Sequence, residues 1–529
     1  PGSLPSDSAE ISGAKLHPSV ERLEDLRPKT VNLFIASEPV HPSGGRQTTR
    51  PVPALALAAL LLLTAAGASD GASEDSRKVV QASEILAAIE RGEPVDYDGV
   101  IVEGDLDLSG LKLPTEHVDR TYEEINYFDL TNEVMVVESP INITNSEIRG
   151  KLGFSNAIFQ KQVNFEKSNF AGSALFSGSN FSGDADFWFT EFSGGYTCFS
   201  YAKFSGGNAN FWCAEFSGGA AYFKYAKFSG GNANFWGAEF SGGAADFWRS
   251  EFSGGAAEFM GVEFSGDYSD FSEAKFSGGT ADFRGAEFSG GAADFSDAEI
   301  DRGAYFNYAQ FNETADFTNS WFKEDVLFEN TTFRGELSLT RTRYNKLYLR
   351  WHNIEGGLAY DDTAYLSLLK NFKDLGYLED YDSCYFDYRK DRRSQLLRSG
   401  ELFSWGINLL LEWFYGYGTK PLNALSFSLG IISVFGAFWR LIGLGKAEEA
   451  LDEYSLADAE HDSILEVLAF SATVFLSGTR LFIEPPPLPK IRGRSRSLIR
   501  GAFIFERVLG ALFSILFFLA ISGTVVRQL

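Results

Sequence analysis

The sequence predicts an all-β solenoid followed by an α-helical linker and an α-helical transmembrane domain. Three observations support this prediction. Gly and Phe number 53 and 49 among 529 residues, the phenylalanines recur at alternating separations of five and seven residues, and two long uncharged apolar runs lie near the carboxyl end. Globular proteins contain about 7% Gly on average, so the excess of both residue types indicates a short unit that is repeated many times.

The amino-terminal part of the sequence is predicted to be a disordered extension and a targeting segment. Residues 1–50 are polar, with no apolar periodicity, and are interpreted as a disordered or non-native extension. An apolar run with a basic flank follows, and it ends in Ala66-Gly67-Ala68. These features are typical of a secretory signal peptide, so residues 51–69 are interpreted as a signal peptide or, alternatively, as a membrane anchor.

Residues 80–150 are predicted to form an amino-terminal cap and the first, irregular coils of the solenoid. Ser83 is a candidate N-cap for a helix that Gly92 would end. Residues 101–108 then alternate between apolar and polar side chains, as a strand with one buried face does.

The regular repeat occupies residues 151–340. Five plus seven residues give a twelve-residue module, of which residues 245–256 are one copy. An odd spacing places successive Phe side chains on opposite faces of a strand, and five residues of a helix separate them by about 140°. The spacing instead fits a chain that makes a short extended segment, turns a corner and repeats. One Phe per segment is then expected inside: Phe199, Phe204, Phe211, Phe216, Phe223, Phe228, Phe235, Phe240, Phe247, Phe252, Phe259, Phe264, Phe271, Phe276, Phe283, Phe288 and Phe295.

The other positions of the module have their own expected roles. The residue two positions before each Phe is small, as at Ala245 and Ser250, and is expected on the same inner face. The acidic residues directly before the Phe, such as Asp246 and Glu251, are expected to point outward to water. Ser-Gly-Gly steps such as residues 253–255 are expected to form corners at which a positive φ carries no penalty.

Several units match the pattern A-[DN]-[LF]-x-x as they stand, among them residues 281–285 (ADFRG) and residues 293–297 (ADFSD). On these units the chain resembles the pentapeptide-repeat family. The resemblance implies a right-handed quadrilateral β-helix, with one pentapeptide on each of four faces in a coil. Every second unit here carries two additional residues, which are interpreted as a widened corner. Two modules then make one coil, and residues 151–340 make about eight coils. The family name describes a shape and does not imply a function.

After the repeat the pattern becomes helical. Residues 360–400 are predicted to form a helical hairpin that links the solenoid to the membrane. Tyr381, Tyr385 and Tyr388 lie at helical spacing on its second helix. The hairpin is interpreted as a structural linker, with a docking site for a partner as the alternative.

Residues 401–529 are predicted to form the membrane domain. Two uncharged apolar runs of 19 residues are each long enough to cross a bilayer. They predict spans at about residues 421–443 and 504–526. The shorter apolar segment at about residues 464–482 is interpreted as a re-entrant helix or as a third span.

A span, a short helix and a second span resemble the two-helix pore module of prokaryotic potassium-type channels. On this resemblance the candidates for lining a pore are Thr473, Ser477, Gly478 and Thr479. The T-V-G-Y-G run of potassium filters is absent from the sequence, so selective potassium conduction is not expected.

Charge and composition exclude several classes of function. There are 46 Lys and Arg residues against 71 Asp and Glu residues, and the net charge of −25 opposes binding to a nucleic-acid backbone. Three Cys and five His residues are scattered and form neither a disulfide framework nor a zinc motif. No catalytic, cofactor-binding or metal-binding residue is predicted, and the protein is not expected to be an enzyme.

The leading hypothesis is an oligomeric, channel-like or transport-related protein of a prokaryotic cell membrane, with several spans and a soluble β-helical domain. The alternative is an extracytoplasmic binding or scaffold module that is tethered to the membrane. A remote alternative, suggested by the acidity of the repeat, is a DNA-mimic inhibitor of a topoisomerase. The expected partners are the lipid bilayer, further copies of the chain and a protein bound to the β-helix, but no nucleic acid. The signal peptide places the β-helix outside the cell. With three spans, the basic residues before the first and before the last span would instead place both stretches, and hence the β-helix, inside. The exported orientation is favoured.

Overall fold

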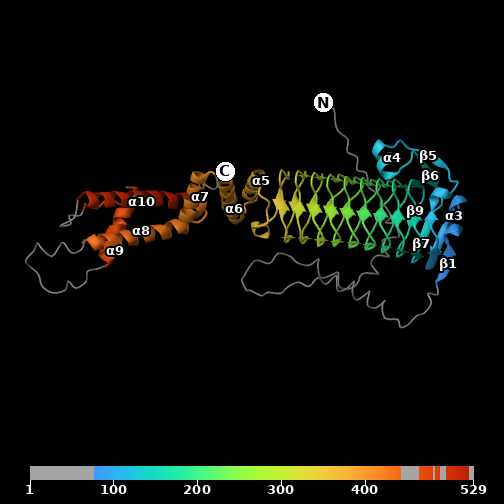
Figure 1. Cartoon of the computed structure of the whole chain (residues 1–529), viewed down its shortest axis with the longest axis horizontal. Coiled ribbons are helices and arrows are strands. Elements are labelled where there is room, and N and C mark those ends of the chain that lie inside the picture. The colour runs from blue at the N-terminus through green and yellow to red at the C-terminus, as the bar shows by residue number, and fades with distance from the viewer. Residues whose placement is uncertain (1–76, 443–463, 480–482, 489–495, 523–529) are drawn as a thin grey trace, which may run out of the picture. The chain divides into compact units, whose positions relative to one another are not determined.

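The computed structural model describes residues 77–442, 464–479, 483–488 and 496–522. Within these residues a β-solenoid runs from β1 (Lys78–Gln81) to β42 (Leu347–Tyr348) and is followed by α-helices (Figure 1). The predicted extension and the predicted signal peptide, residues 1–50 and 51–69, lie outside the described residues.

Four sheets form the walls of the solenoid. Sheet I has 11 strands, from β2 (Val95–Asp98) to β42, and sheet II has 11 strands, from β1 to β40 (Thr332–Phe333). Sheet III has 10 strands, from β4 (Leu106–Asp107) to β41 (Leu337–Ser338), and sheet IV has 10, from β5 (Thr115–His117) to β38 (Trp321–Phe322). Successive coils pair in parallel, while β5 is antiparallel to β6 (Glu133–Val137) at the edge of sheet IV. One coil passes through the four sheets in turn, as do β15 (Ala185–Asp186), β16 (Glu191–Phe192), β17 (Thr197–Cys198) and β18 (Lys203–Phe204).

The strand register shows how long each coil is. In sheet I, Ala209 pairs with Ala233 and Ala233 with Ala257, so equivalent positions in neighbouring coils are separated by 24 residues. The interpretation that two twelve-residue modules make one coil is therefore confirmed in this region. Because equivalent residues lie directly above one another, each position of the module becomes a row along the solenoid.

The rows of Phe form the core of the solenoid. All 17 predicted Phe side chains are 2% exposed or less. Equivalent rings stack between coils, as for Phe211 and Phe235 at 4.8 Å between centroids, and adjacent rows meet edge to face, as for Phe211 and Phe223 at 5.5 Å. The small residues Ala245 and Ser250 are buried beside them. Burying one such Phe side chain contributes about 1.5–3 kcal/mol to the stability of the fold. The stacked Phe rows therefore stabilise the packing of each coil on the next.

The prediction that the Ser-Gly-Gly steps provide positive φ is confirmed at Gly195, which has a φ of 54°, but is wrong for the other Ser-Gly-Gly steps. Neither Gly254 nor Gly255 has a positive φ. Instead, a Cβ on Gly254 would lie 2.7 Å from the carbonyl oxygen of Gly231, and one on Gly255 would lie 2.0 Å from Oδ1 of Asn232. These corners stack so closely that glycine is needed for space between coils rather than for its backbone freedom.

Positive φ occurs at the other corner type, two residues after a Phe. Between sheets III and IV this corner is occupied by residues that have a side chain. They form the row Tyr201, Tyr225, Arg249, Glu273 and Asp297, with φ between 55° and 58°. A left-handed conformation costs roughly 1–2 kcal/mol for such a residue. The side chains of the row offset part of this cost by contacting one another: the Tyr201 and Tyr225 rings lie 4.5 Å apart, and Arg249 Nε donates to Glu273 at 2.7 Å.

Helices cover the amino-terminal end of the solenoid. Helix α3 (Ala82–Glu90) buries Ile85 and Ile89 against the first coils, and Gly92 follows it with a φ of 70°. The N-cap is Gln81 rather than the predicted Ser83, because the helix starts directly after β1. Helix α4 (Tyr122–Phe128) lies on an arm beside the solenoid and brings Phe128 within 4.8 Å of the Tyr201 ring.

A helical hairpin closes the other end. It consists of α5 (Asp362–Leu375) and α6 (Leu378–Arg398), after the short η3 (Trp351–Asn353). Tyr381, Tyr385 and Tyr388 are buried in the same hydrophobic cluster as the Phe rows. Asp380 accepts a hydrogen bond from the backbone N–H of Trp351 at 2.8 Å. The three tyrosines are therefore part of the cap and do not present a docking surface.

The carboxyl-terminal region is α-helical, and two of its described helices are long enough to cross a membrane. Helices α8 (Pro421–Ile442) and α10 (Arg496–Ser522) have 22 and 27 residues and are apolar enough to span a bilayer. Helix α9 (Ile464–Leu476) has 13 residues, which is about 20 Å of helix. That is less than the hydrocarbon core of about 30 Å. Before them lie α7 (Leu402–Tyr415) and η4 (Gly416–Gly418).

Candidate functional site

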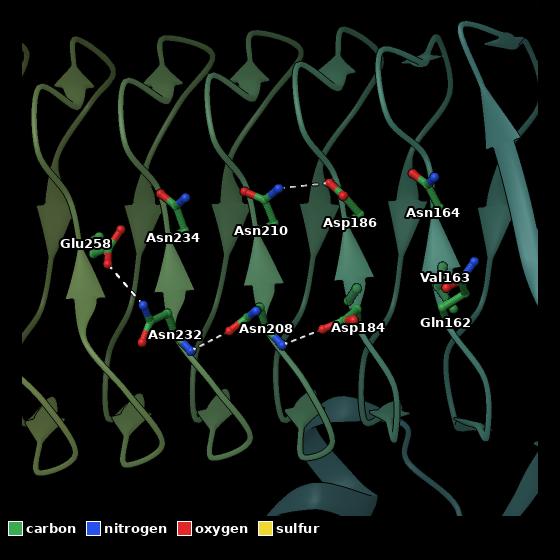
Figure 2. Close-up of a pocket in the computed structure, with 11 residues that line it drawn as sticks. Gln162, Val163, Asn164, Asp184, Asp186, Asn208, Asn210, Asn232, Asn234 and Glu258 are labelled. Atoms are coloured by element: carbon green, nitrogen blue, oxygen red, sulfur yellow. Dashed lines mark hydrogen bonds between the residues drawn. The ribbon is translucent and has the colours of Figure 1, made fainter. Parts of the chain in front are cut away.

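Sheet I carries two rows of polar side chains on its outer face (Figure 2). The strands beneath these rows place one apolar residue inward, Val163 in the first of them and Ala in the others, and the residues on either side of it therefore both point outward. One row contains Asp184, Asn208 and Asn232, and the second contains Asn164, Asp186, Asn210, Asn234 and Glu258. Together they line a shallow groove of about 410 Å³.

Hydrogen bonds run along both rows and join them at Glu258. Asn210 Nδ2 donates to Asp186 Oδ1 at 3.1 Å, and Asn232 Nδ2 donates to Glu258 Oε1 at 3.1 Å (Figure 2). The backbone N–H of Asn208 donates to Asp184 Oδ1, and that of Asn232 donates to Asn208 Oδ1, both at 2.9 Å. Burial raises the pKa of the Asp186 carboxyl. The rows thus hold a fixed array of amides and carboxylates.

A row of tryptophans lies beside the groove. Trp188, Trp212 and Trp236 stack with centroids 5.5 Å and 5.3 Å apart. Their backbone N–H groups donate to the Oδ1 atoms of Asp186, Asn210 and Asn234 at 2.9–3.2 Å. The sequence contains a signal for this arrangement that the Phe spacing does not reveal: Gly-[Asn/Asp]-Ala-[Asn/Asp]-Phe-Trp occurs three times at intervals of 24 residues, starting at Gly183.

Sheet II carries a row of like charges. Its outward residues Glu191, Glu215, Glu239, Glu263 and Glu287 pair in direct register. Burial, together with the neighbouring carboxylates, raises the pKa of Glu215 and of Glu239. On sheet IV the same position carries both signs, and Glu251 lies between Lys227 and Lys275.

The expectation that every acidic residue before a Phe faces water is wrong for Asp246. Its side chain is 1% exposed, and its carboxylate lies 2.8 Å from Nζ of Lys224. Lys224 also lies over the rings of Tyr222 and Trp248. Asp246 does point away from the Phe core, but Lys224 and Tyr222 of the preceding coil, together with Trp248, cover it.

The described residues show no grouping typical of a metal site. They contain no group of three His, Cys, Asp or Glu side chains that could hold a metal ion. Cys198, Cys213 and Cys384 are free, and burial raises the pKa of the Cys213 thiol to about 11. A rigid polar face of this kind can bind a partner through hydrogen bonds and charge.

The carboxyl-terminal helices α8, α9 and α10 bury some of their apolar side chains against one another and expose others. Helices α8, α9 and α10 contact one another and bury residues such as Trp439, Val474, Phe475 and Phe513. Apolar side chains are also exposed on the outside of α8 and α10: Leu425, Leu429, Val434, Leu441, Val508, Leu512, Ile515, Phe518 and Ile521.

The predicted pore-lining residues do not share one environment. Ser477 is buried, and its hydroxyl donates to the Val474 carbonyl at 2.7 Å. Gly478 packs against α10 so closely that a Cβ would lie 2.2 Å from the Arg507 carbonyl oxygen. Thr473 donates to the Ala469 carbonyl of its own helix, and Thr479 is half-buried. Within one chain, Ser477 and Gly478 therefore face α10 rather than open space.

Comparison with protein families supports the repeat. The model for pentapeptide repeats (nine copies) matches residues 143–191, 247–299 and 295–343. Comparison with curated proteins and comparison with solved structures give no match.

Proposed function

We propose that this chain, whose solenoid is built from pentapeptide repeats, is a non-enzymatic scaffold that is anchored in a membrane and displays a rigid polar face beside it. The solenoid supplies the rigidity, because its Phe rows form one continuous core that α5 and α6 close. The grooved face of sheet I is the surface offered to a protein partner.

The apolar exterior of the carboxyl-terminal helices is the observation that carries this proposal. Soluble proteins rarely expose large contiguous apolar patches, yet α8 and α10 do so along their length. Helix α7 adds an amphipathic segment, on which Phe403 is 82% exposed and Trp413 is 60% exposed. Its other side is tied to α6 by the Arg389–Asn408 hydrogen bond of 2.9 Å. Such a helix suits the headgroup region of a bilayer.

Flotation with liposomes tests the anchor. The full chain, reconstituted from detergent, is expected to float with the lipid and to resist extraction at high salt, because the apolar helices lie in the hydrocarbon. Phe403→Glu is expected to weaken the contact of α7 with the headgroups and to increase its digestion by added protease. Tyr122→Glu is the matched control, since this side chain is 72% exposed but belongs to the arm beside the solenoid. Recovery of the full chain in the lipid-free fraction would contradict the proposal.

The orientation of the solenoid has its own test. The apolar segment that ends at Ala68 favours an exported solenoid. Protease added to intact cells is then expected to digest the solenoid without permeabilisation. Protection of the solenoid until the membrane is opened would instead place it in the cytoplasm.

An oligomeric channel is the second candidate function. It is favoured by α9, whose 13 described residues are fewer than a span needs and which packs against two helices that are long enough. In an oligomer, the exposed apolar surfaces of α8 and α10 would be shared between lipid and neighbouring copies. This candidate predicts a defined oligomer in detergent and an ionic current in liposomes. A monomer that carries no current under any ionic condition would exclude it.

A further inference from the structure

A buried carboxyl group joins the three membrane-domain helices. Glu506 on α10 is fully buried. Its Oε2 accepts a hydrogen bond from Trp439 Nε1 on α8 at 2.8 Å, and its Oε1 is hydrogen-bonded to Ser471 Oγ on α9. Ionisable groups at this depth of a membrane protein are costly, and they commonly mark a functional site.

The described residues around Glu506 provide no compensating charge. Among the described residues no Lys, Arg or His forms an ion pair with it. The charged residues on the packed helices are Arg440 on α8, Glu466 on α9, and Arg496, Arg500 and Arg507 on α10. All but Arg507 are exposed. Arg507 contacts the Ser477 carbonyl at 3.3 Å and lies over the Phe503 ring. An ionised Glu506 would therefore be a buried charge without a counter-ion in the part of the chain that the structure describes.

The hydrogen bonds of Ser471 indicate whether Glu506 is protonated or ionised. Ser471 Oγ lies 2.9 Å from the Ile432 carbonyl oxygen of α8 and also contacts Glu506 Oε1. A hydroxyl carries one proton, and a carbonyl oxygen only accepts. If Ser471 donates to Ile432, its contact with Glu506 needs a second proton. A neutral Glu506 supplies that proton and satisfies both contacts, whereas a carboxylate leaves one contact without a hydrogen.

We propose that Glu506 is a proton-binding site that latches α9 between α8 and α10. In the assembled helices the carboxylic acid donates to Ser471 Oγ, Ser471 donates to the Ile432 carbonyl, and Trp439 donates to the other carboxyl oxygen. Loss of the proton to water leaves a charge that these contacts do not neutralise, and α9 is released. The fit of α9 is close, because a Cβ on Gly510 would lie 1.9 Å from the Phe475 carbonyl oxygen.

Infrared difference spectroscopy of the full chain in lipid nanodiscs tests this site. Wild type minus Glu506→Gln is expected to show the C=O absorption of a protonated carboxylic acid at neutral pH. Glu466→Gln, on the exposed side of α9, is the control and is expected to show no such band. Absence of the band at neutral pH, or an unchanged band in Glu506→Gln, would overturn the proposal.

A second variant keeps the test decisive if Glu506→Gln does not fold. Ser471→Ala removes the acceptor, so the carboxylic acid band is expected to shift to higher frequency, as for a carboxyl with a weaker hydrogen bond. An identical band in wild type and Ser471→Ala would show that Glu506 does not donate to Ser471. Protease digestion after Gly478 is expected to increase with pH in wild type, and digestion that is equal at all pH values would refute the latch.

Discussion

Replacing Glu239 by Gln is expected to stabilise the solenoid at neutral pH. Glu239 lies in register with Glu215 and Glu263 on the neighbouring strands of sheet II. Adjacent strands are about 4.8 Å apart, and like charges that face each other across strands destabilise by roughly 0.2–1 kcal/mol per pair. Removing both repulsions should therefore increase the free energy of unfolding by about 0.4–2 kcal/mol.

The pH dependence of this gain has a definite sign. Burial and the two neighbouring carboxylates raise the pKa of Glu239 in the folded state. Its folded state therefore binds a proton more tightly than the unfolded state, whose pKa is about 4.3. The resulting stabilisation is present below the unfolded pKa and is lost as the pH rises through the folded pKa. Glu239→Gln should match wild type at acid pH, exceed it increasingly as the pH rises from the unfolded to the folded pKa, and keep a constant advantage above the folded pKa.

Glu251→Gln is the matched control, because Glu251 occupies the same position of the module on sheet IV. Its carboxylate lies 3.1 Å from Nζ of Lys227, so this variant loses an attraction and should be neutral or less stable by up to about 1 kcal/mol. Urea unfolding in detergent, followed by tryptophan fluorescence across pH, measures both variants. The reasoning is refuted if Glu239→Gln is no more stable than Glu251→Gln at neutral pH.

Three further predictions concern the solenoid. Gly254→Ala should destabilise it by about 1–3 kcal/mol in urea unfolding, because the new Cβ overlaps the Gly231 carbonyl. Gly110→Ala, which meets open space, should change little, and equal effects of the two variants would contradict this. Lys224→Met leaves Asp246 buried without its cation and should cost about 1–3 kcal/mol, while adding Asp246→Asn should recover most of the loss; no recovery would show that the ion pair is not the cause. Alkylation of Cys213, followed by peptide mass spectrometry, should keep accelerating up to a pH of about 11, and a plateau near pH 9 would be inconsistent with its burial.

The solenoid can be predicted from the sequence because the pattern that produces it is local and repeated. Phe at separations of five and seven residues indicates short segments joined by corners, and the same spacing explains the 24-residue coil. The polar rows of sheet I could also have been read from the recurring Gly-[Asn/Asp]-Ala-[Asn/Asp]-Phe-Trp motif. Two apolar runs likewise indicate the two membrane-length helices, because length and hydropathy are sufficient for that prediction.

Contacts between coils and between helices were decided only by the tertiary structure. Gly254 is needed for the approach of the Gly231 carbonyl, and Asp246 is covered by Lys224, a residue from the preceding coil. Among the carboxyl-terminal helices, Trp439, Ser471 and Glu506 come together from α8, α9 and α10. The local sequence around each residue determines its strand or helix and the direction of its side chain. Its burial and its partners depend on chain segments 20 to 70 residues away, as for Trp439 and Glu506, which are 67 residues apart. Packing, not local pattern, therefore decides the chemistry of this protein's buried polar groups.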